Sequence, residues 1–361
     1  MGTSRQHEYL SDGQRIARAL RGSWRVAPPS PNLTEQDLIR ILPRVKESGA
    51  ASLVWWSIRR TPLAKTPTGA VLRQLYMEQS VYAARSQIHV YRYVSALHTE
   101  QIEPIVFKGW ALLPYYAEAG LRPVGDVDLA VAPEVAERAR NTLERFNLRD
   151  WEVDVHAGLE DPVHSAYIPF LTWDDVFAHT RRVPIGDRQV RCLAPEDELQ
   201  LLCIHFMRHR GFRPVWLCDI AAALEARPAN FDWARALSKP PYTSWITYTL
   251  RLAEQLFDVN LGDTPLSANK FTLPEWLVRG VLERWGEPTK PQNVIYDSVF
   301  QLWRNPSRWA EAWRVRVHDR FSAAIECCGS LDEPFLMRYQ LFLMARTLTD
   351  FARRNVTSNA E

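Results

Sequence analysis

Apolar and polar positions before residue 100 recur with the period of an α-helix. The segment TEQDLIRILPRVKESG opens with Thr34, a residue type that caps helix N-termini, and closes at Gly49, a residue type that ends helices. Apolar residues return at helical spacing between residues 70 and 97. The pattern predicts a helical N-terminal region over residues 1–98.

Short apolar runs then alternate with helical stretches, and they predict a small mixed β-sheet within residues 99–192. A hairpin is expected over residues 181–193, with Gly186 and Asp187 in its turn. The other expected strands are residues 103–107, 127–131 and 151–155, and the expected helices are residues 109–119 and 133–146.

From Pro195 onward the apolar spacing is helical again, which predicts a helical C-terminal domain over residues 193–361. The chain therefore has an α+β pattern, with a small mixed β-sheet core between a helical N-terminal and a helical C-terminal region.

Composition narrows the class of protein. The formal net charge is +2, which argues against the broad basic surface that nucleic-acid binding needs, although the cluster RHRGFR at residues 208–213 offers local positive charge. The 5 cysteines show no disulfide or metal spacing, and the chain shows no signal peptide or membrane-spanning run. We expect a cytoplasmic protein without a membrane partner.

Two acids interrupt the apolar run GDVDLAV in a way that suggests chemistry. Side chains alternate between the two faces of a strand, so Asp126 and Asp128 emerge on one face while Val127 and Leu129 point to the other. Two neighbouring carboxylates repel each other unless a cation lies between them or one stays protonated. The triplet is a weak motif by itself, because acids are common at strand ends.

The surroundings of this pair strengthen the prediction of a site. Upstream, a strand runs into Lys108 and Gly109, where a glycine at a helix start can accept phosphate oxygens. Downstream, WEVDVH places Asp154 on a third strand, with His156 on the same face. Three carboxylates on neighbouring strands beside such a turn suit a two-metal centre for nucleotidyl transfer.

The segments FKG, LRPVGDVDLAV, EVDVH and LAPEDELQLLCIHFMRHRGFRPVWLCDIAAAL together resemble the uncharacterised bacterial nucleotidyltransferases of the DNA polymerase β superfamily. The resemblance covers roughly residues 70–225, and it makes residues 99–192 the nucleotidyltransferase α/β core.

The resemblance implies a role for each site residue. Asp126 and Asp128 would bind divalent metal with the triphosphate, and Asp154 would act on the attacking hydroxyl as the third metal-site acid. The residues that match nucleotide-binding positions are Lys108, Gly109 and Arg122. The implied cofactor is Mg²⁺ or Mn²⁺, and the implied substrate is a nucleoside triphosphate. Familiar members carry Gly-Ser where this chain has Lys108-Gly109-Trp110, so the serine hydroxyl that would touch a phosphate is missing and Lys108 would substitute as a point charge.

The leading hypothesis is transfer of a nucleoside monophosphate to a hydroxyl of a small molecule, a peptide or a protein. One alternative is a catalytically silent nucleotide-binding partner or regulatory protein, from a biosynthetic or toxin–antitoxin operon. Another is a metal-dependent phosphohydrolase, although the histidine-rich ligand sets of such enzymes are missing from the sequence.

Several site residues also have purely structural explanations. Lys108 is also explained as a surface lysine, Gly109 as a turn residue and Arg122 as an ion-pair partner of the acids. His156 is a candidate satisfied histidine beside the site, and a buried hydrogen bond between His205 and Asp219 would tie the helical domain together.

Overall fold

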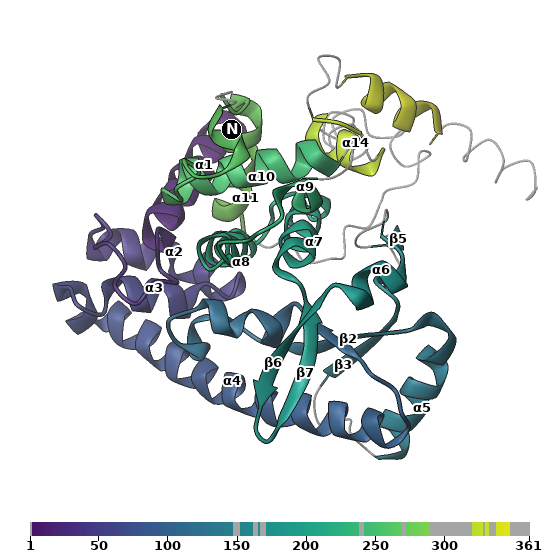
Figure 1. Cartoon of the computed structure of the whole chain (residues 1–361). Coiled ribbons are helices and arrows are strands. Elements are labelled where there is room, and N and C mark those ends of the chain that lie inside the picture. The colour runs from purple at the N-terminus through teal and green to yellow at the C-terminus, as the bar shows by residue number, and fades with distance from the viewer. Residues whose placement is uncertain are drawn as a thin grey trace, which may run out of the picture.

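The computed structural model describes residues 2–146, 152–161, 165–166, 171–237, 242–268, 272–288, 320–327, 329–331 and 337–346. A five-stranded mixed sheet lies at one end of the molecule, and helices from both ends of the chain gather at the other (Figure 1). This arrangement confirms the predicted α+β fold class with a small mixed sheet between helical regions.

The strand order of the main sheet is β3-β2-β1-β7-β6. The central strand β1 is antiparallel to β2 and parallel to β7, while β2 and β3 are parallel. The strands are β1 (Ile105–Phe107), β2 (Asp126–Val131), β3 (Glu152–Ala157), β6 (Thr180–Ile185) and β7 (Arg188–Leu193). Strands β4 (Glu160–Asp161) and β5 (Ser165–Ala166) form a separate antiparallel pair.

These strands confirm the sequence prediction in the described part of the chain. The hairpin of β6 and β7 turns at Gly186, whose φ of 58° suits glycine. The predicted strand over residues 151–155 is β3, one residue later at its start, and Trp151 lies outside the described residues.

Helix α4 (Pro67–Thr99) covers one face of the sheet together with α5 (Ala136–Arg145). Buried side chains of α4, such as Val90 and Val94, join Val127 and Leu129 of β2 in one apolar cluster. The opposite face buries Phe107, with other residues, against α6 (Trp173–Ala178) and α7 (Pro195–Arg208). The alternation of β2 thus separates a packed face, toward α4, from the face that carries its acids.

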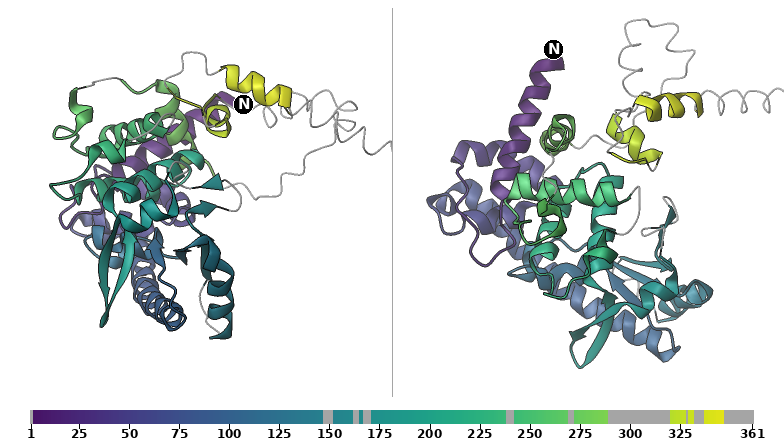
Figure 2. Two further views of the ribbon diagram at one scale, coloured as in Figure 1. Left: turned by 45° about the vertical axis from the view of Figure 1, so that its right-hand side comes forward. Right: turned by 45° about the horizontal axis from the view of Figure 1, so that its top comes forward.

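The helical regions before and after the sheet share one apolar core. Helix α1 packs along α11, so the two regions lie side by side (Figure 2). The helices before the sheet are α1 (Gly2–Leu20), α2 (Glu35–Glu47), α3 (Ala51–Ile58) and η1 (Pro62–Lys65), followed by α4. The described helices that follow α7 are α8 (Pro214–Glu225), α9 (Trp233–Ala236), α10 (Tyr242–Phe257), η5 (Pro265–Ala268), α11 (Glu275–Gly286) and α14 (Arg320–Glu326).

Local capping agrees with the predicted helix starts. Thr34 caps α2 and forms a capping box with Asp37, as the residue type at this position predicted. The helix ends before Gly49, whose φ is 77°.

The predicted helix over residues 109–119 is wrong in type. The chain forms two 3₁₀ helices there, η2 (Gly109–Tyr115) and η3 (Ala119–Leu121). Pro114 lies inside the segment and has no N–H to donate, which prevents a continuous α-helix. The predicted helix over residues 133–146 is confirmed as η4 (Pro133–Val135) followed by α5.

Four cysteines of the described chain, Cys192, Cys203, Cys218 and Cys327, are free thiols. Among the helices that the structure describes, none has the length and apolar character needed to cross a lipid bilayer.

A buried ion pair joins the segment between η3 and β2 to helix α8. Arg122 donates from Nε and Nη2 to the two carboxylate oxygens of Asp219, each at 3.2 Å. Tyr116 donates to the same carboxylate at 2.6 Å, and Asp219 is fully buried. The sequence suggested a hydrogen bond between Asp219 and His205. In the structure Asp219 pairs with Arg122 and Tyr116 instead.

We expect Asp219→Ala to lower the free energy of unfolding by about 3–5 kcal/mol, because it leaves the buried guanidinium of Arg122 without its counter-charge. The matched control is Asp263→Ala, which removes a 70% exposed carboxylate paired with Arg227 and should cost less than about 1 kcal/mol. Urea denaturation measures both. Equal losses in the two variants would contradict the structural role assigned to the buried pair.

Candidate functional site

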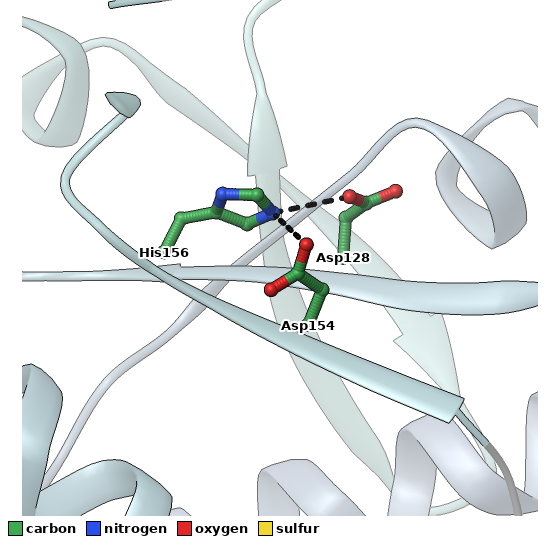
Figure 3. Close-up of side chains that lie close together, drawn as sticks. All are labelled: Asp128, Asp154 and His156. Atoms are coloured by element: carbon green, nitrogen blue, oxygen red, sulfur yellow. Dashed lines mark hydrogen bonds and ion pairs between the residues drawn. The ribbon is translucent and has the colours of Figure 1, made fainter. Parts of the chain in front are cut away.

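The parallel register of β2 and β3 brings two acids together. Asp128 lies directly opposite Asp154, and Ala130 lies opposite His156. Because side chains two residues apart share a face, Asp154 and His156 both emerge on the face that carries Asp128. The strand pairing alone therefore creates the cluster drawn in Figure 3.

His156 lies between the two carboxylates. Its Nε2 is 3.2 Å from Oδ1 of Asp128 and 3.2 Å from Oδ2 of Asp154. The imidazole is buried and packs edge-on against Phe107 of β1, the strand on the far side of β2, with ring centroids 5.2 Å apart. The Asp154 side chain is 59% exposed, so the cluster opens to solvent on the β3 side.

The charges of this cluster shift its titration. Burial disfavours the imidazolium, but hydrogen bonds to Asp128 and Asp154 outweigh it and raise the pKa of His156 to about 9. The hydrogen bond from His156 lowers the pKa of Asp154. Without a metal, the imidazolium is the cation that separates the two carboxylates.

Three side chains of this cluster could hold a metal ion. Among the described residues, Asp128, Asp154 and His156 form a group whose potential ligand atoms all lie within 4.8 Å of one another. Asp126 belongs to no such group. The predicted trio Asp126, Asp128 and Asp154 therefore lies on one face of the sheet. Within it, Asp128 and Asp154 are joined through His156.

A cavity of about 540 Å³ opens beside the acids, and Asp126 and Asp128 form part of its wall. Burial and the neighbouring charge of Asp128 raise the pKa of Asp126, while Arg122 and Lys108 oppose this shift. The cavity volume falls within the range usual for small-molecule sites.

Lys108 and Gly109 form the cavity edge that follows β1. The Lys108 Nζ lies 3.4 Å from Oδ1 of Asp128. Lys108 has φ 53° and ψ −153°, close to a region that only glycine populates freely, so its backbone is strained. At Gly109, φ is 33° and an added Cβ would lie 3.3 Å from the carbonyl oxygen of Asp126. The glycine is therefore required by the backbone itself, beyond any ligand.

Arg122 also lines the cavity, but Asp219 neutralises its charge. Burial opposes the charge of the guanidinium, and the carboxylate of Asp219 raises the pKa of Arg122 all the same. Its Nη1 donates to the carbonyl of Pro123 at 2.7 Å. Arg122 thus acts as a fixed part of the cavity wall, and the acids of β2 are not its hydrogen-bonded partners.

Residues that the sequence analysis did not assign to the site form the other cavity wall. Helix α7 contributes His205, α8 contributes Trp216, and Arg213 lies at the N-cap of α8. His205 packs against Trp216, with ring centroids 4.6 Å apart, and the Arg213 guanidinium lies 5.5 Å from the Trp216 ring. Burial and the nearby charge of Lys108 lower the pKa of His205 far below its ordinary value, so this imidazole is neutral.

The helical N-terminal region completes the cavity with Ser48, Gln79 and Tyr82. The cavity is therefore bounded by all three parts of the chain. Two residues of the wall beside α7 and α8 were named from the sequence: Arg213 as part of the RHRGFR cluster, and His205 as a structural residue.

Comparisons with known proteins give one match. The model of a family described as uncharacterised nucleotidyltransferase matches residues 34–258, which is more than half of the chain and includes every cavity residue named above. No curated protein and no solved structure matches the chain.

The pKa of His156 gives a pH prediction for the metal-free protein. Because this pKa is raised from 6.5 to about 9 on folding, the stabilisation is complete below about pH 6.5 and is lost as the pH rises through about 9. The loss is at most about 3 kcal/mol, and less because Asp154 is largely exposed.

Urea denaturation in EDTA between pH 6 and pH 10 measures this loss. His156→Gln should flatten the decline. A variant that declines as steeply as the parent would assign the pH dependence to other groups.

Strain at Lys108 gives a second prediction. Lys108→Gly and Lys108→Met both remove the ammonium, but only glycine relieves the backbone strain. The free energy of unfolding of Lys108→Gly should therefore exceed that of Lys108→Met by about 1–3 kcal/mol. Glycine also gains entropy when unfolded, which places the expected difference at the lower end. Chemical denaturation compares the two variants, and Lys65→Met on the surface is the control. Equal stability of the two Lys108 variants would contradict the strain.

Proposed function

We propose a function for this chain, which belongs to the uncharacterised nucleotidyltransferase family. The protein transfers a nucleoside monophosphate from a nucleoside triphosphate to a hydroxyl group, with the help of a divalent metal. The observation that carries the proposal is the register of β2 and β3, which sets Asp154 opposite Asp128. Asp128 lines a cavity whose wall also includes Lys108.

The donor set fits a divalent cation. Carboxylate oxygens are the ligands that Mg²⁺ prefers, and an added imidazole nitrogen suits Mn²⁺ as well. The positive imidazolium of His156 lies between Asp128 and Asp154, so the two carboxylates favour positive charge at this point. We assign Asp126 and Asp128 as the acids that hold metal with the triphosphate, and Asp154 as the third metal-site acid, on the acceptor side. When bound, Mg²⁺ or Mn²⁺ would offset charge on the phosphates and polarise the reacting phosphorus.

The cavity wall supplies the nucleotide side of the site. Lys108 would bind phosphate oxygens through its ammonium, and Gly109 would let them approach the backbone. Arg122, held by Asp219, would keep its position while the triphosphate binds. The triphosphate would thus lie between Lys108 and Gly109 on one side and the acids on the other.

Asp154 serves the acceptor side. Its carboxylate is largely exposed, and its lowered pKa keeps it ionised at neutral pH, so it can take the proton of an approaching hydroxyl. His156 orients this carboxylate through its hydrogen bond. The acceptor is a small molecule, a peptide or a protein, since the net charge of +2 gives little attraction for a nucleic acid.

A nucleotide panel tests binding first. Thermal shift with ATP, GTP, CTP and UTP, each with and without Mg²⁺, should show stabilisation by at least one nucleotide that depends on the metal. Stabilisation that does not depend on the metal would favour a catalytically silent nucleotide-binding protein. No stabilisation by any nucleotide would favour a regulatory protein.

Two substitutions then separate catalysis from binding. Asp154→Asn should leave nucleotide binding largely intact and lower turnover by roughly 10²–10⁴-fold, the range that general-base assistance supplies. Asp128→Asn should weaken metal-dependent nucleotide binding itself, because it removes the carboxylate that lines the cavity. Asp187→Asn in the β6–β7 turn makes the same chemical change far from the site and should alter neither property.

Turnover is measured as pyrophosphate release with candidate acceptors, and binding by calorimetry. If Asp128→Asn and Asp154→Asn change stability alone, with binding and turnover intact, the acids are structural partners of His156 and Lys108, and the assignment is wrong.

A further inference from the structure

The solvent face of α4 carries an apolar stripe. Met77, Val81 and Ile88 are 55%, 60% and 59% exposed, and Ala84 between them is exposed too. The opposite face of the helix is buried against the sheet, through residues such as Val90. Figure 1 shows α4 along the outer border of the molecule, with the sheet on its inner side. Packing against the described part of the chain therefore does not account for the stripe.

The spacing of the stripe is that of a coiled-coil seam. Residues 77, 81, 84 and 88 are separated by four, three and four positions, the alternation of successive a and d positions in a heptad. Helix α4 spans 33 residues without interruption, so the seam lies on a long rigid rod.

The order of the seam is symmetric about a point between residues 82 and 83. Two copies of α4 that cross there in antiparallel fashion would place Met77 against Ile88 and Val81 against the small side chain of Ala84. Each contact would occur twice, as a two-fold interface requires.

Charge beside the seam fits the same antiparallel arrangement. Glu78 and Arg85 flank it on one side, and the antiparallel arrangement brings Glu78 of one copy beside Arg85 of the other, twice. Glu78 also accepts a hydrogen bond from Gln74 at 3.0 Å. Opposite charges at flanking positions select the partner and its direction.

From this symmetric seam and its complementary charges we propose that the protein forms a homodimer through antiparallel packing of α4 against α4 of a second copy. Gln79 and Tyr82, which line the cavity, lie on the other side of the helix, so the dimer leaves both cavities open. The dimer does not rest on the proposed function, since no residue of the seam belongs to the cavity or the acid cluster.

Light scattering coupled to gel filtration tests the dimer on the full chain. The parent should elute with about twice the chain mass of 41.7 kDa. Val81→Glu should give the monomer mass, because it buries two carboxylates at the centre of the seam. The matched control is Val26→Glu, which changes a 70% exposed valine outside α4 and should leave the dimer intact.

Charge reversal tests the identity of the partner. Glu78→Arg and Arg85→Glu should each raise the dimer Kd by roughly tenfold, and the double variant should restore it, because the complementary pair is rebuilt between copies. Circular dichroism confirms that each variant keeps its helices.

Two results would overturn the proposal. One is a parent protein that stays monomeric at about 100 μM, a concentration at which an interface with a micromolar Kd is mostly occupied. The other is a dimer that Val81→Glu and the charge reversals leave unchanged. A monomer that binds a different protein through α4 belongs to the first case.

Discussion

Repulsion between carboxylates is the constraint on which the site depends. Parallel pairing of β2 and β3 forces Asp128 and Asp154 to be neighbours, and the alternation of β2 adds Asp126 to the same face. Like charges at such distances are stable only with cations among them or with one acid protonated. The imidazolium of His156 and the ammonium of Lys108 lie 3.2 Å and 3.4 Å from Asp128 and supply that positive charge. The sheet therefore defines a place for positive charge before any ligand arrives.

The helical regions matter to this site because they bound the cavity beside it. The ion pair between Arg122 and Asp219 ties the segment before β2 to α8, which also carries Trp216. Since Asp219 is fully buried, this link fixes the cavity wall relative to the acids. The N-terminal helices share their apolar core with the C-terminal ones, so a shift of either would move the same wall.

Local sequence patterns predicted most of the fold and the acids of the site, but not the cavity wall that the helices supply. The alternation in GDVDLAV, the hairpin at Gly186 and the Thr34 cap are local, and each appears in the structure. The 3₁₀ form of residues 109–115 differs from the predicted α-helix, and Pro114, which has no N–H to donate, accounts for the difference. The pairing of Arg122 with Asp219 spans 97 positions, and nothing local to either residue selects the other. Trp216 and Arg213 join the cavity through tertiary packing alone, which no periodicity encodes.

The charges around the cavity also explain why nucleotide binding should need a metal. A triphosphate would enter beside Asp126 and Asp128, whose negative charge repels it. Arg122 adds little attraction because Asp219 already neutralises it, and Lys108 is shared with Asp128. Arg213 remains, but it lies on the opposite wall, near the Trp216 ring. The cations of the chain therefore balance its own acids and leave little surplus for phosphate. A divalent ion bound by the same acids reverses the local charge, so metal and nucleotide should bind with positive coupling, each raising the affinity for the other.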